Sequence, residues 1–248
     1  MLKEERQQLI LNALYQEGKV LVNDLSQQYA ISRDTVRRDL TELEDQGVLR
    51  RVFGGAIPTR MPAAAIDIRR NVDRPQKQTV AQKAVSLIKP NALIAIDGGT
   101  TNLMLAQAIP MGLAVRVVTN SFPVAAELRL RPQAEVIFLG GNYDKGSQTT
   151  VGEAAIQQLE RYHFDQCFLG VHAIDAEMGV SVPYPFEKEA AIKKELVRRS
   201  DEVIAMCSNS KLDKHTNYII CALESLDIIL CDEPVSQAMA SRYQGRIR

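Results

Sequence analysis

Residues 32–47 read SRDTVRRDLTELEDQG, and this stretch decides the fold of the first part of the chain. Ser32 can accept a hydrogen bond from a first-turn amide and so begin a helix, while Gly47 can take the left-handed conformation that ends one. At about 100° per residue, hydrophobic side chains fall on one side of this helix and arginines on the other. The hydrophobic residues are Val36, Leu40 and Leu43. The stretch therefore predicts an amphipathic helix with one packed face and one exposed face.

The exposed face of the predicted helix carries groups suited to DNA. Guanidinium groups and a threonine hydroxyl on its early turns can reach phosphates and guanine edges in a major groove. An ordinary amphipathic surface helix is the alternative, but the neighbouring segments favour DNA binding. Residues 9–14 and 23–29 have helical spacing, with Asn23 as the expected cap of the second helix. Residues 48–55 alternate apolar and basic side chains before paired glycines, so the segments together predict a winged helix-turn-helix.

The run resembles the DNA-binding domain of the DeoR family of bacterial regulators. The matching segments are VNDL at 22–25, TVRRDL at 35–40, LEDQG at 43–47 and LRRVFGGA at 49–56. Phe53 stands where many relatives have histidine. The resemblance implies that DNA is contacted by Thr35, Arg37 and Arg38, with Arg33, Arg50 and Arg51 on the flanking backbone.

Net charge does not distinguish this domain, because residues 1–60 hold nine basic and nine acidic side chains. A non-specific DNA binder is usually strongly basic. The acids gather at residues 4–5 and 42–45, away from the arginine-rich start of the predicted recognition helix. We therefore expect modest non-specific affinity for DNA, so that binding to a double-stranded DNA operator depends on base contacts. It should also depend on a homo-oligomer, either a dimer or a tetramer.

Length and composition fit a protein with two domains. The 248 residues, 46% hydrophobic and 24% charged, can form a small domain and a larger one with a substantial core. No apolar run approaches the ~18 residues of a membrane helix, and the polar N-terminus carries no secretory signal, so we expect a cytoplasmic protein without membrane contact. The four cysteines lack Cys-x-x-Cys pairs and the three histidines lack metal spacing. We expect buried free thiols, no metal and no cofactor.

Three regions divide the chain: the winged helix-turn-helix at 1–57, a linker without periodicity at 58–78, and an effector-sensing α/β domain at 79–248. In the third region short apolar runs alternate with helical stretches, which indicates a mostly parallel sheet covered by helices on both faces. The predicted strands are 93–96, 115–118, 136–139, 167–171, 203–206, 218–221 and 228–230. The predicted helices are 80–89, 102–109, 123–130, 153–162 and 186–199.

A ligand of such a sheet binds beyond the carboxyl ends of the strands. The turn DGGTT at 97–101 offers glycine amides, threonine hydroxyls and a helix N-terminus, all of which suit an anion. Glycine turns after strands are also common for steric reasons alone, but polar turns follow three further strands and would converge on the same edge. The residues expected in this site are Asp97, Gly98, Gly99, Thr100, Thr101, Asn120, Ser121, Gly140, Gly141 and Lys211.

This part of the chain resembles the effector-sensing domain of the DeoR family. The matching segments are DGGTT at 97–101, VTNS at 118–121, LGG at 139–141, FLG at 168–170 and SK at 210–211. The resemblance implies a fold similar to ribose-5-phosphate isomerase and a phosphorylated sugar as effector. It also adds Glu189 to the expected site, although Glu189 and Lys193, four residues apart on one helix, can instead form a simple ion pair.

The sequence favours a transcriptional regulator that a sugar phosphate releases from DNA or modulates. The resemblance implies a repressor of a carbohydrate-utilisation operon, since regulators of this family are most often repressors. The alternative is a sugar-phosphate isomerase-like enzyme with an accessory DNA-binding domain. Isomerisation needs a general base, which Asp97, Glu187, Glu189 or Lys211 could supply. The only acidic residue at 169–175 is Asp175, whereas isomerases that resemble this fold carry a closely spaced aspartate pair there. We expect no enzyme activity, since a fold alone does not confer chemistry.

Overall fold

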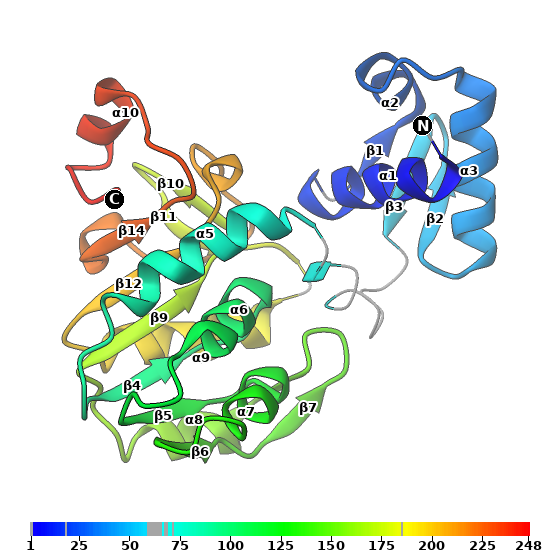
Figure 1. Ribbon diagram of the computed structural model, residues 1–248. Helices are drawn as coiled ribbons and strands as arrows, with labels where there is room; N and C mark the ends of the chain where they lie inside the picture. Colours follow the sequence, from blue (N-terminus) through cyan, green and yellow to red (C-terminus); the bar gives the residue numbers. More distant parts are fainter. Residues whose placement is uncertain (1, 18, 59–65, 67–68, 71, 185) are drawn as a thin grey trace. The chain divides into compact units, whose positions relative to one another are not determined.

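The computed structural model describes residues 2–17, 19–58, 66, 69–70, 72–184 and 186–248. They fall into two compact units, Met1–Val72 and Asp73–Arg248, each with its own hydrophobic core (Figure 1). Residues 59–65, 67–68 and 71 of the predicted linker lie outside the described residues. A helix begins at Arg74, inside the range predicted as linker, so regular structure resumes earlier than the sequence pattern indicated.

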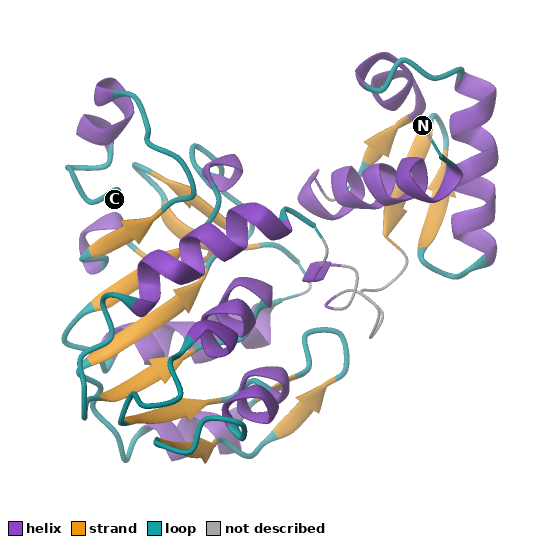
Figure 2. Cartoon of the chain, viewed as in Figure 1, coloured by secondary structure: helices purple, strands orange, loops and turns teal. Residues whose placement is uncertain are grey.

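The first unit is a winged helix-turn-helix, as predicted. Three helices pack on a small antiparallel sheet with the strand order β1-β3-β2 (Figure 2). The elements are α1 (Lys3–Glu17), β1 (Val20–Leu21), α2 (Val22–Gln28), α3 (Arg33–Asp45), β2 (Leu49–Val52) and β3 (Gly55–Pro58). Buried side chains from all six elements form the core: Ile10, Leu14, Val20, Leu25, Val36, Leu40, Leu43, Leu49 and Ala56.

The ends of α3 follow the chemistry of its boundary residues. The Ser32 hydroxyl accepts a hydrogen bond from the Thr35 amide at 3.1 Å, which confirms the predicted cap. At the other end Gly47 has a φ of +73°, and the Val48 amide donates back to the Leu43 carbonyl at 3.0 Å. This is the Schellman arrangement, which satisfies carbonyls that the last helical turn leaves open.

The prediction that Asn23 caps α2 is wrong. The helix begins at Val22, and Leu21 occupies the cap position without a side-chain hydrogen bond. The Val22 amide instead donates to the Gly54 carbonyl at 2.9 Å. The turn between β2 and β3 therefore satisfies one of the amides that the first turn of α2 leaves without a helical acceptor.

A bidentate ion pair fastens α3 to α1. The Arg6 guanidinium donates two hydrogen bonds to Asp39, whose side chain is 3% exposed, and this contact raises the pKa of Arg6. The Glu42 carboxylate accepts hydrogen bonds from Lys3 at 2.8 Å and from Gln7 at 2.7 Å, and the Lys3 contact lowers the pKa of Glu42. These contacts fix the orientation of α3 on the core, so its arginine-bearing face stays exposed.

The second unit is built on a six-stranded parallel sheet with the order β14-β12-β9-β4-β5-β6. Helices α5, α6 and α7 cover one face of the sheet, and α8 and α9 cover the other (Figure 1). The strands are β4 (Leu93–Ile96), β5 (Val115–Thr119), β6 (Ala134–Phe138), β9 (Gln166–Gly170), β12 (Val203–Met206) and β14 (Ile228–Leu230). The helices are α5 (Arg74–Val85), α6 (Thr100–Ala108), α7 (Phe122–Leu128), α8 (Glu153–Leu159) and α9 (Glu187–Arg198).

The strand order reverses between β4 and β9. Strands β5 and β6 extend the sheet on one side of β4, while β9, β12 and β14 extend it on the other. The chain therefore leaves the carboxyl ends of these two central strands in opposite directions, which is the position where open α/β sheets bind their ligands.

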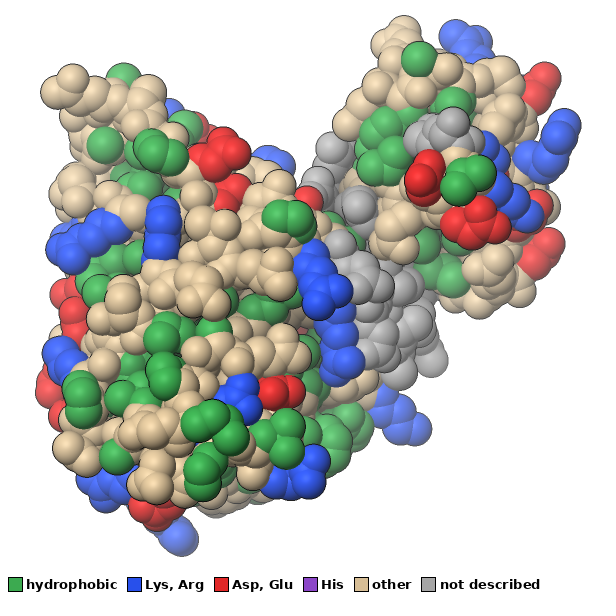
Figure 3. Space-filling view, viewed as in Figure 1, with side chains coloured by type: hydrophobic (Ala, Val, Ile, Leu, Met, Phe, Trp, Pro, Cys, Tyr) green, Lys and Arg blue, Asp and Glu red, His purple; other side chains and the backbone are tan. Residues whose placement is uncertain are grey.

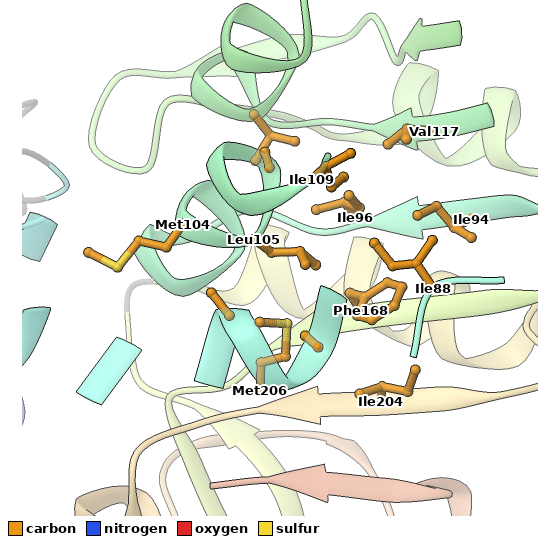
Figure 4. Packing of buried hydrophobic residues seen from close by; sticks show 14 of the residues in the cluster. Ile88, Ile94, Ile96, Met104, Leu105, Ile109, Val117, Phe168, Ile204 and Met206 are labelled. Atoms are coloured by element: carbon orange, nitrogen blue, oxygen red, sulfur yellow. The ribbon is translucent and has the colours of Figure 1, made fainter. Parts of the chain in front are cut away.

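The core of the second unit lies between the central strands and the helices of one face. Ile94, Ile96, Phe168 and Ile204 come from three adjacent strands and form one cluster with Ile88 and with Leu105 of α6 (Figure 4). Each of these side chains is buried. Unbroken apolar strands are what a parallel sheet covered on both faces requires, and they fix the rigid platform from which the carboxyl-end turns project.

Part of the second unit departs from the predicted sheet. The predicted strand at 218–221 forms as β13 (Tyr218–Cys221), but it joins a separate antiparallel sheet with β10 (Ala173–Asp175) and β11 (Gly179–Val182). A short apolar run does not specify which sheet it joins. The hairpin of β7 (Asn142–Asp144) and β8 (Thr149–Val151) and the helix α10 (Gln237–Arg242) were not predicted.

The four cysteines are free thiols, as predicted. Cys167, Cys207 and Cys231 are buried, and Cys221 is half-buried. Burial, and secondarily the nearby Asp97 carboxylate, raises the pKa of Cys167, so this thiol stays protonated at neutral pH. Among the described residues, no helix is long and apolar enough to span a bilayer.

Candidate functional site

The first unit presents exposed guanidinium groups on α3 and on the neighbouring strand β2. Arg33 and Arg38 on α3 and Arg50 on β2 are exposed, and their side chains form no hydrogen bond or ion pair within the described part of the chain. Thr35 lies half-buried on the first turn, where its hydroxyl is 2.8 Å from that of Ser32. Charged side chains line the edge of the unit over α3 (Figure 3). Exposed guanidinium groups of this kind can bond phosphates or guanine edges.

The other two predicted DNA contacts are engaged within the protein. Arg37 donates to Asp34 at 3.1 Å on the exposed surface of α3. Arg51 donates to Glu44 at 2.9 Å and also bonds the Thr41 hydroxyl, which holds strand β2 against α3. Both arginines remain exposed, and exposed ion pairs are weak enough for phosphates to replace the carboxylates.

In the second unit, a buried ion pair stands where the strand order reverses. Asp97 follows β4, Lys193 lies on α9, and each side chain is 3% exposed. The Asp97 carboxylate also accepts the Gly170 amide at 3.1 Å, and the Lys193 ammonium also donates to the Gly170 carbonyl at 2.9 Å. The two charges thus neutralise each other, and the backbone amide and carbonyl of Gly170 at the end of β9 provide further hydrogen bonds to them. Lys193 pairs with Asp97 rather than with Glu189, the alternative that the spacing on the helix suggested.

Asn102 and Gly170 bring the ends of β4 and β9 into direct contact. The buried Asn102 amide nitrogen donates to the Asp97 carbonyl at 2.9 Å and to the Phe168 carbonyl at 3.0 Å. A Cβ atom on Gly170 would lie 2.5 Å from the Gly98 carbonyl oxygen and 3.2 Å from the Asp97 carboxylate. Only glycine fits at this position, because backbone atoms occupy the space that a side chain would need.

The turn after β4 presents the N-terminus of α6. Gly99 occupies the cap position with a φ of +115°, and no side chain caps the helix. Thr100 is 7% exposed and Thr101 is half-buried. A helix N-terminus without a capping side chain leaves backbone donors for a ligand, and the helix dipole favours an anion there.

The end of β5 lies beside this turn. A Cβ atom on Gly98 would be 2.5 Å from the Thr149 methyl group and 4.0 Å from the Ser121 Cβ. The Asn120 side chain is buried and donates to the Thr150 carbonyl at 2.9 Å, while its Oδ1 accepts no hydrogen bond from the described residues. Ser121 caps α7 with its hydroxyl. Asn120 and Ser121 therefore belong to the same cluster of turns as Gly98.

Lys211 and Glu189 approach the junction from the other half of the sheet. The Lys211 ammonium donates to the Val171 carbonyl at 2.9 Å, which places it at the carboxyl end of β9, one residue beyond Gly170. Glu189 is half-buried and lies one turn before Lys193 on α9, so both residues share a helix face. The structure thus gathers Asp97, Lys193 and Lys211 around the end of β9, with Glu189 one helical turn from Lys193.

Gly140 and Gly141 pack the end of β6 against α8. The Gly140 amide donates to the Gln158 side chain at 3.1 Å. Gly141 has a φ of +144°, and a Cβ atom there would lie 2.9 Å from the Val151 carbonyl and 3.1 Å from the Ala155 Cβ. These contacts give both glycines a steric role and commit the Gly140 amide to a protein acceptor.

Sequence reasoning missed three residues that shape the junction: Lys193 as the partner of Asp97, Asn102 and Gly170. One signal was present for Lys193, which lies on the buried stripe of α9 with Ala190 and Leu196. A charge within a hydrophobic stripe requires a buried partner. Nothing in the local pattern identifies that partner, because Asp97 is 96 residues away.

Two of the carboxylates considered in connection with catalysis, Asp175 and Asp97, have structural partners. Asp175 accepts hydrogen bonds from the Glu177 and Met178 amides, each at 2.9 Å, and these bonds lower its pKa. It therefore shapes the turn between β10 and β11. Asp97 is held by Lys193 and by the Gly170 amide, and its side chain is only 3% exposed, so it is not available as a base for a ligand.

A separate hollow of about 290 Å³ lies away from the junction. It is lined by Lys83, Ser86, Leu87, Leu230 and Arg248. The Lys83 ammonium donates to the Cys231 carbonyl at 2.7 Å, so one of its two cations is committed to the backbone. None of the residues predicted to bind DNA or the effector lines this hollow.

Comparisons with known proteins match both units. Residues 6–59 match the DeoR-like helix-turn-helix domain, and residues 72–233 match the DeoR C-terminal sensor domain. An Escherichia coli O157:H7 protein named for repression of the aga operon is 34% identical over 93% of this chain and 87% of its own length. The HTH-type transcriptional repressor GlcR of Bacillus subtilis is 30% identical over 96% and 92%. These relatives are transcriptional regulators rather than enzymes.

Among solved structures, ribose 5-phosphate isomerase A from Methanocaldococcus jannaschii shares 17% identity with this chain. The superposition covers 55% of this chain and 53% of the isomerase, with a TM-score of 0.40.

Replacing Lys193 by methionine is expected to destabilise the second unit by about 3–5 kcal/mol, because the Asp97 charge would stay buried without its partner. The matched control is Lys194→Met, which changes an exposed neighbour on the same helix and should alter stability by less than about 0.5 kcal/mol. Scanning calorimetry of the full-length protein measures both. Equal effects of the two substitutions would show that the Asp97–Lys193 pair does not hold the junction together.

Proposed function

Because this chain belongs to the DeoR family of transcriptional regulators, we propose that it represses a carbohydrate-utilisation operon until a phosphorylated sugar binds at the β4–β9 junction. The helix-turn-helix unit binds DNA, and the second unit is the sensor domain. The observation that carries the proposal is the meeting of the uncapped α6 N-terminus with the end of β9, where Lys211 lies. The repressor names of two relatives support negative control as the mode of action.

For the operator, we place α3 in the major groove with Arg38 on a base edge or a phosphate. Arg38 lies on the face opposite the buried Val36 and Leu40, and its side chain has no competing partner among the described residues. Arg33 and Arg50 flank it and are equally exposed, which suits contacts to the DNA backbone. Arg37 and Arg51 join them by exchanging Asp34 and Glu44 for phosphates.

For the effector, we place the phosphate at the turn 98–101. Backbone amides at a helix N-terminus bind phosphate oxygens, and the two threonine hydroxyls add donors. Lys211 neutralises part of the charge from the end of β9. The sugar hydroxyls face Asn120 and Glu189, whose polar groups can orient a polyol.

We further propose that the repressor acts as a homo-oligomer. One recognition helix contacts too few base pairs for the affinity typical of an operator, and two copies on adjacent half-sites provide the remainder. The equal number of acids and bases in residues 1–60 adds to this requirement, because the non-specific attraction to phosphates is small.

We expect Arg38→Ala to weaken operator binding by about 1–3 kcal/mol, the range for one lost bidentate base contact. Thermal stabilisation by the effector should stay unchanged, since Arg38 belongs to the other unit. The probe is a duplex selected from a random-sequence library by the wild-type protein, and affinity is measured by fluorescence anisotropy. Arg161→Ala removes an exposed arginine of the sensor unit and serves as control. Wild-type affinity in the Arg38 variant would refute the assignment of α3 as the recognition helix.

Effector binding should weaken by roughly 1–3 kcal/mol in both Thr100→Ala and Lys211→Ala, since each change removes a hydrogen bond or charge from a phosphate. A thermal-shift screen of phosphorylated sugars supplies the ligand, because a ligand at one hundred times its dissociation constant stabilises a protein by about 2.7 kcal/mol. Titration calorimetry then compares that sugar with its unphosphorylated form, using Lys214→Ala as an exposed control. Comparable affinity for the two sugars, or full affinity in Lys211→Ala, would contradict a phosphate site at this turn.

A further inference from the structure

The tip of the wing carries a fully exposed aromatic side chain. Phe53 lies in the two-residue turn between β2 and β3, and its relative exposure is 106%. A phenylalanine normally buries 150–250 Å², about the whole of its side-chain surface, when it packs. Leaving the ring in water is unfavourable in the free protein, so its position calls for a partner that covers it.

The turn that carries Phe53 is held firmly in place. Gly54 has a φ of +81°, and its carbonyl accepts the Val22 amide at 2.9 Å, which ties the turn to the start of α2. Gly55 packs directly on β1, since a Cβ atom there would lie 1.9 Å from the Val20 carbonyl oxygen. The ring is therefore presented at the end of a braced hairpin rather than on a free loop.

The surroundings of the wing are those of a DNA contact. The Arg51 backbone amide donates to the Glu44 carboxylate of α3 at 2.8 Å, so the wing lies alongside the recognition helix even when the Arg51 guanidinium turns to a phosphate. Arg50, three residues before Phe53, is exposed and its side chain has no partner among the described residues. A narrow basic hairpin ending in an aromatic ring matches the apolar wedges that proteins insert between base pairs from the minor groove.

We propose that Phe53 inserts between two adjacent base pairs in the minor groove beside the major groove that α3 occupies. The inserted ring unstacks that step and bends the duplex toward the major groove. Pyrimidine–purine steps unstack most easily, so the operator must carry such a step at a fixed distance from the bases read by α3. Phe53 thereby determines specificity through the deformability of DNA, without a hydrogen bond to a base. This proposal rests on the operator contact through α3.

A protein partner is the competing occupant, because Leu21 and Val52 near the wing tip are also partly exposed, at 42% and 41%. The arginines favour DNA, because the exposed guanidinium group of Arg50 beside the ring can bond to backbone phosphates on both sides of the groove. A protein contact also offers no reason for the hairpin to be joined to the recognition helix through Arg51.

The test uses the full-length wild type, Phe53→Ala and Phe53→Leu with duplexes selected by each protein from a random-sequence library. The wild type is expected to select a pyrimidine–purine step at a fixed position, and Phe53→Ala to lose that preference. On the wild-type operator, Phe53→Ala should bind about 5- to 150-fold more weakly, the equivalent of one aromatic stack. A 2-aminopurine placed at the step should brighten on binding of the wild type and of Phe53→Leu, which keeps an apolar wedge, but not of Phe53→Ala.

Phe122→Ala is the matched control, because Phe122 is 57% exposed in the sensor unit. It should leave selection, affinity and 2-aminopurine fluorescence unchanged. The proposal is overturned if Phe53→Ala selects the same step and produces the same fluorescence as the wild type. It is also overturned if Phe53→Ala changes the oligomeric state instead, which would assign the ring to a protein contact. Failure of the operator contact itself is distinguished by Arg38→Ala, which would then bind the selected duplex like the wild type.

Discussion

The buried ion pair between Asp97 and Lys193 is the interaction on which the geometry of the sensor unit depends. Two charges are removed from water where the strand order reverses, and such a pair is tolerated only when its remaining hydrogen-bonding groups are satisfied. The amide and carbonyl of Gly170 provide those bonds, so the pair joins β4, β9 and α9 at one point. The turn 98–101 begins directly after Asp97, and the pair therefore also sets the direction in which the α6 N-terminus faces.

In the proposed function, both units bind phosphate in the same physical way, through donors that have no acceptor among the described residues. In the DNA-binding unit these donors are guanidinium groups on α3 and β2, and the Arg6–Asp39 pair holds α3 against α1. In the sensor unit they are the backbone donors of an uncapped helix on a rigid sheet. Charge is neutral overall in the chain, so position rather than net charge makes these surfaces attractive to anions.

Local chemistry made α3 and the central strands predictable from sequence. Ser32 and Gly47 mark the helix ends by hydrogen bonding and by backbone conformation, and the strands at 93–96 and 203–206 have the predicted bounds because they are unbroken apolar runs. The short strands β7, β8, β10 and β11 were missed, since polar residues interrupt them and none is an unbroken apolar run. The Asp97–Lys193 pair was also missed, because it depends on which face of the sheet α9 covers. The paired glycines at 140–141 suggested an anion site from sequence. In the structure, close contacts with α8 and β8 account for these glycines, because they leave no space for a side chain at Gly141 and little at Gly140.

The central claim is that the β4–β9 junction binds the phosphorylated effector, and hydrogen exchange tests it most directly. Adding the phosphorylated sugar found by thermal shift should slow exchange of the amides at residues 98–102 and around Lys211, while the unphosphorylated sugar should leave them unchanged. Protection of α5 and the C-terminal residues instead would place the ligand in the hollow lined by Lys83 and Arg248 and would contradict the account.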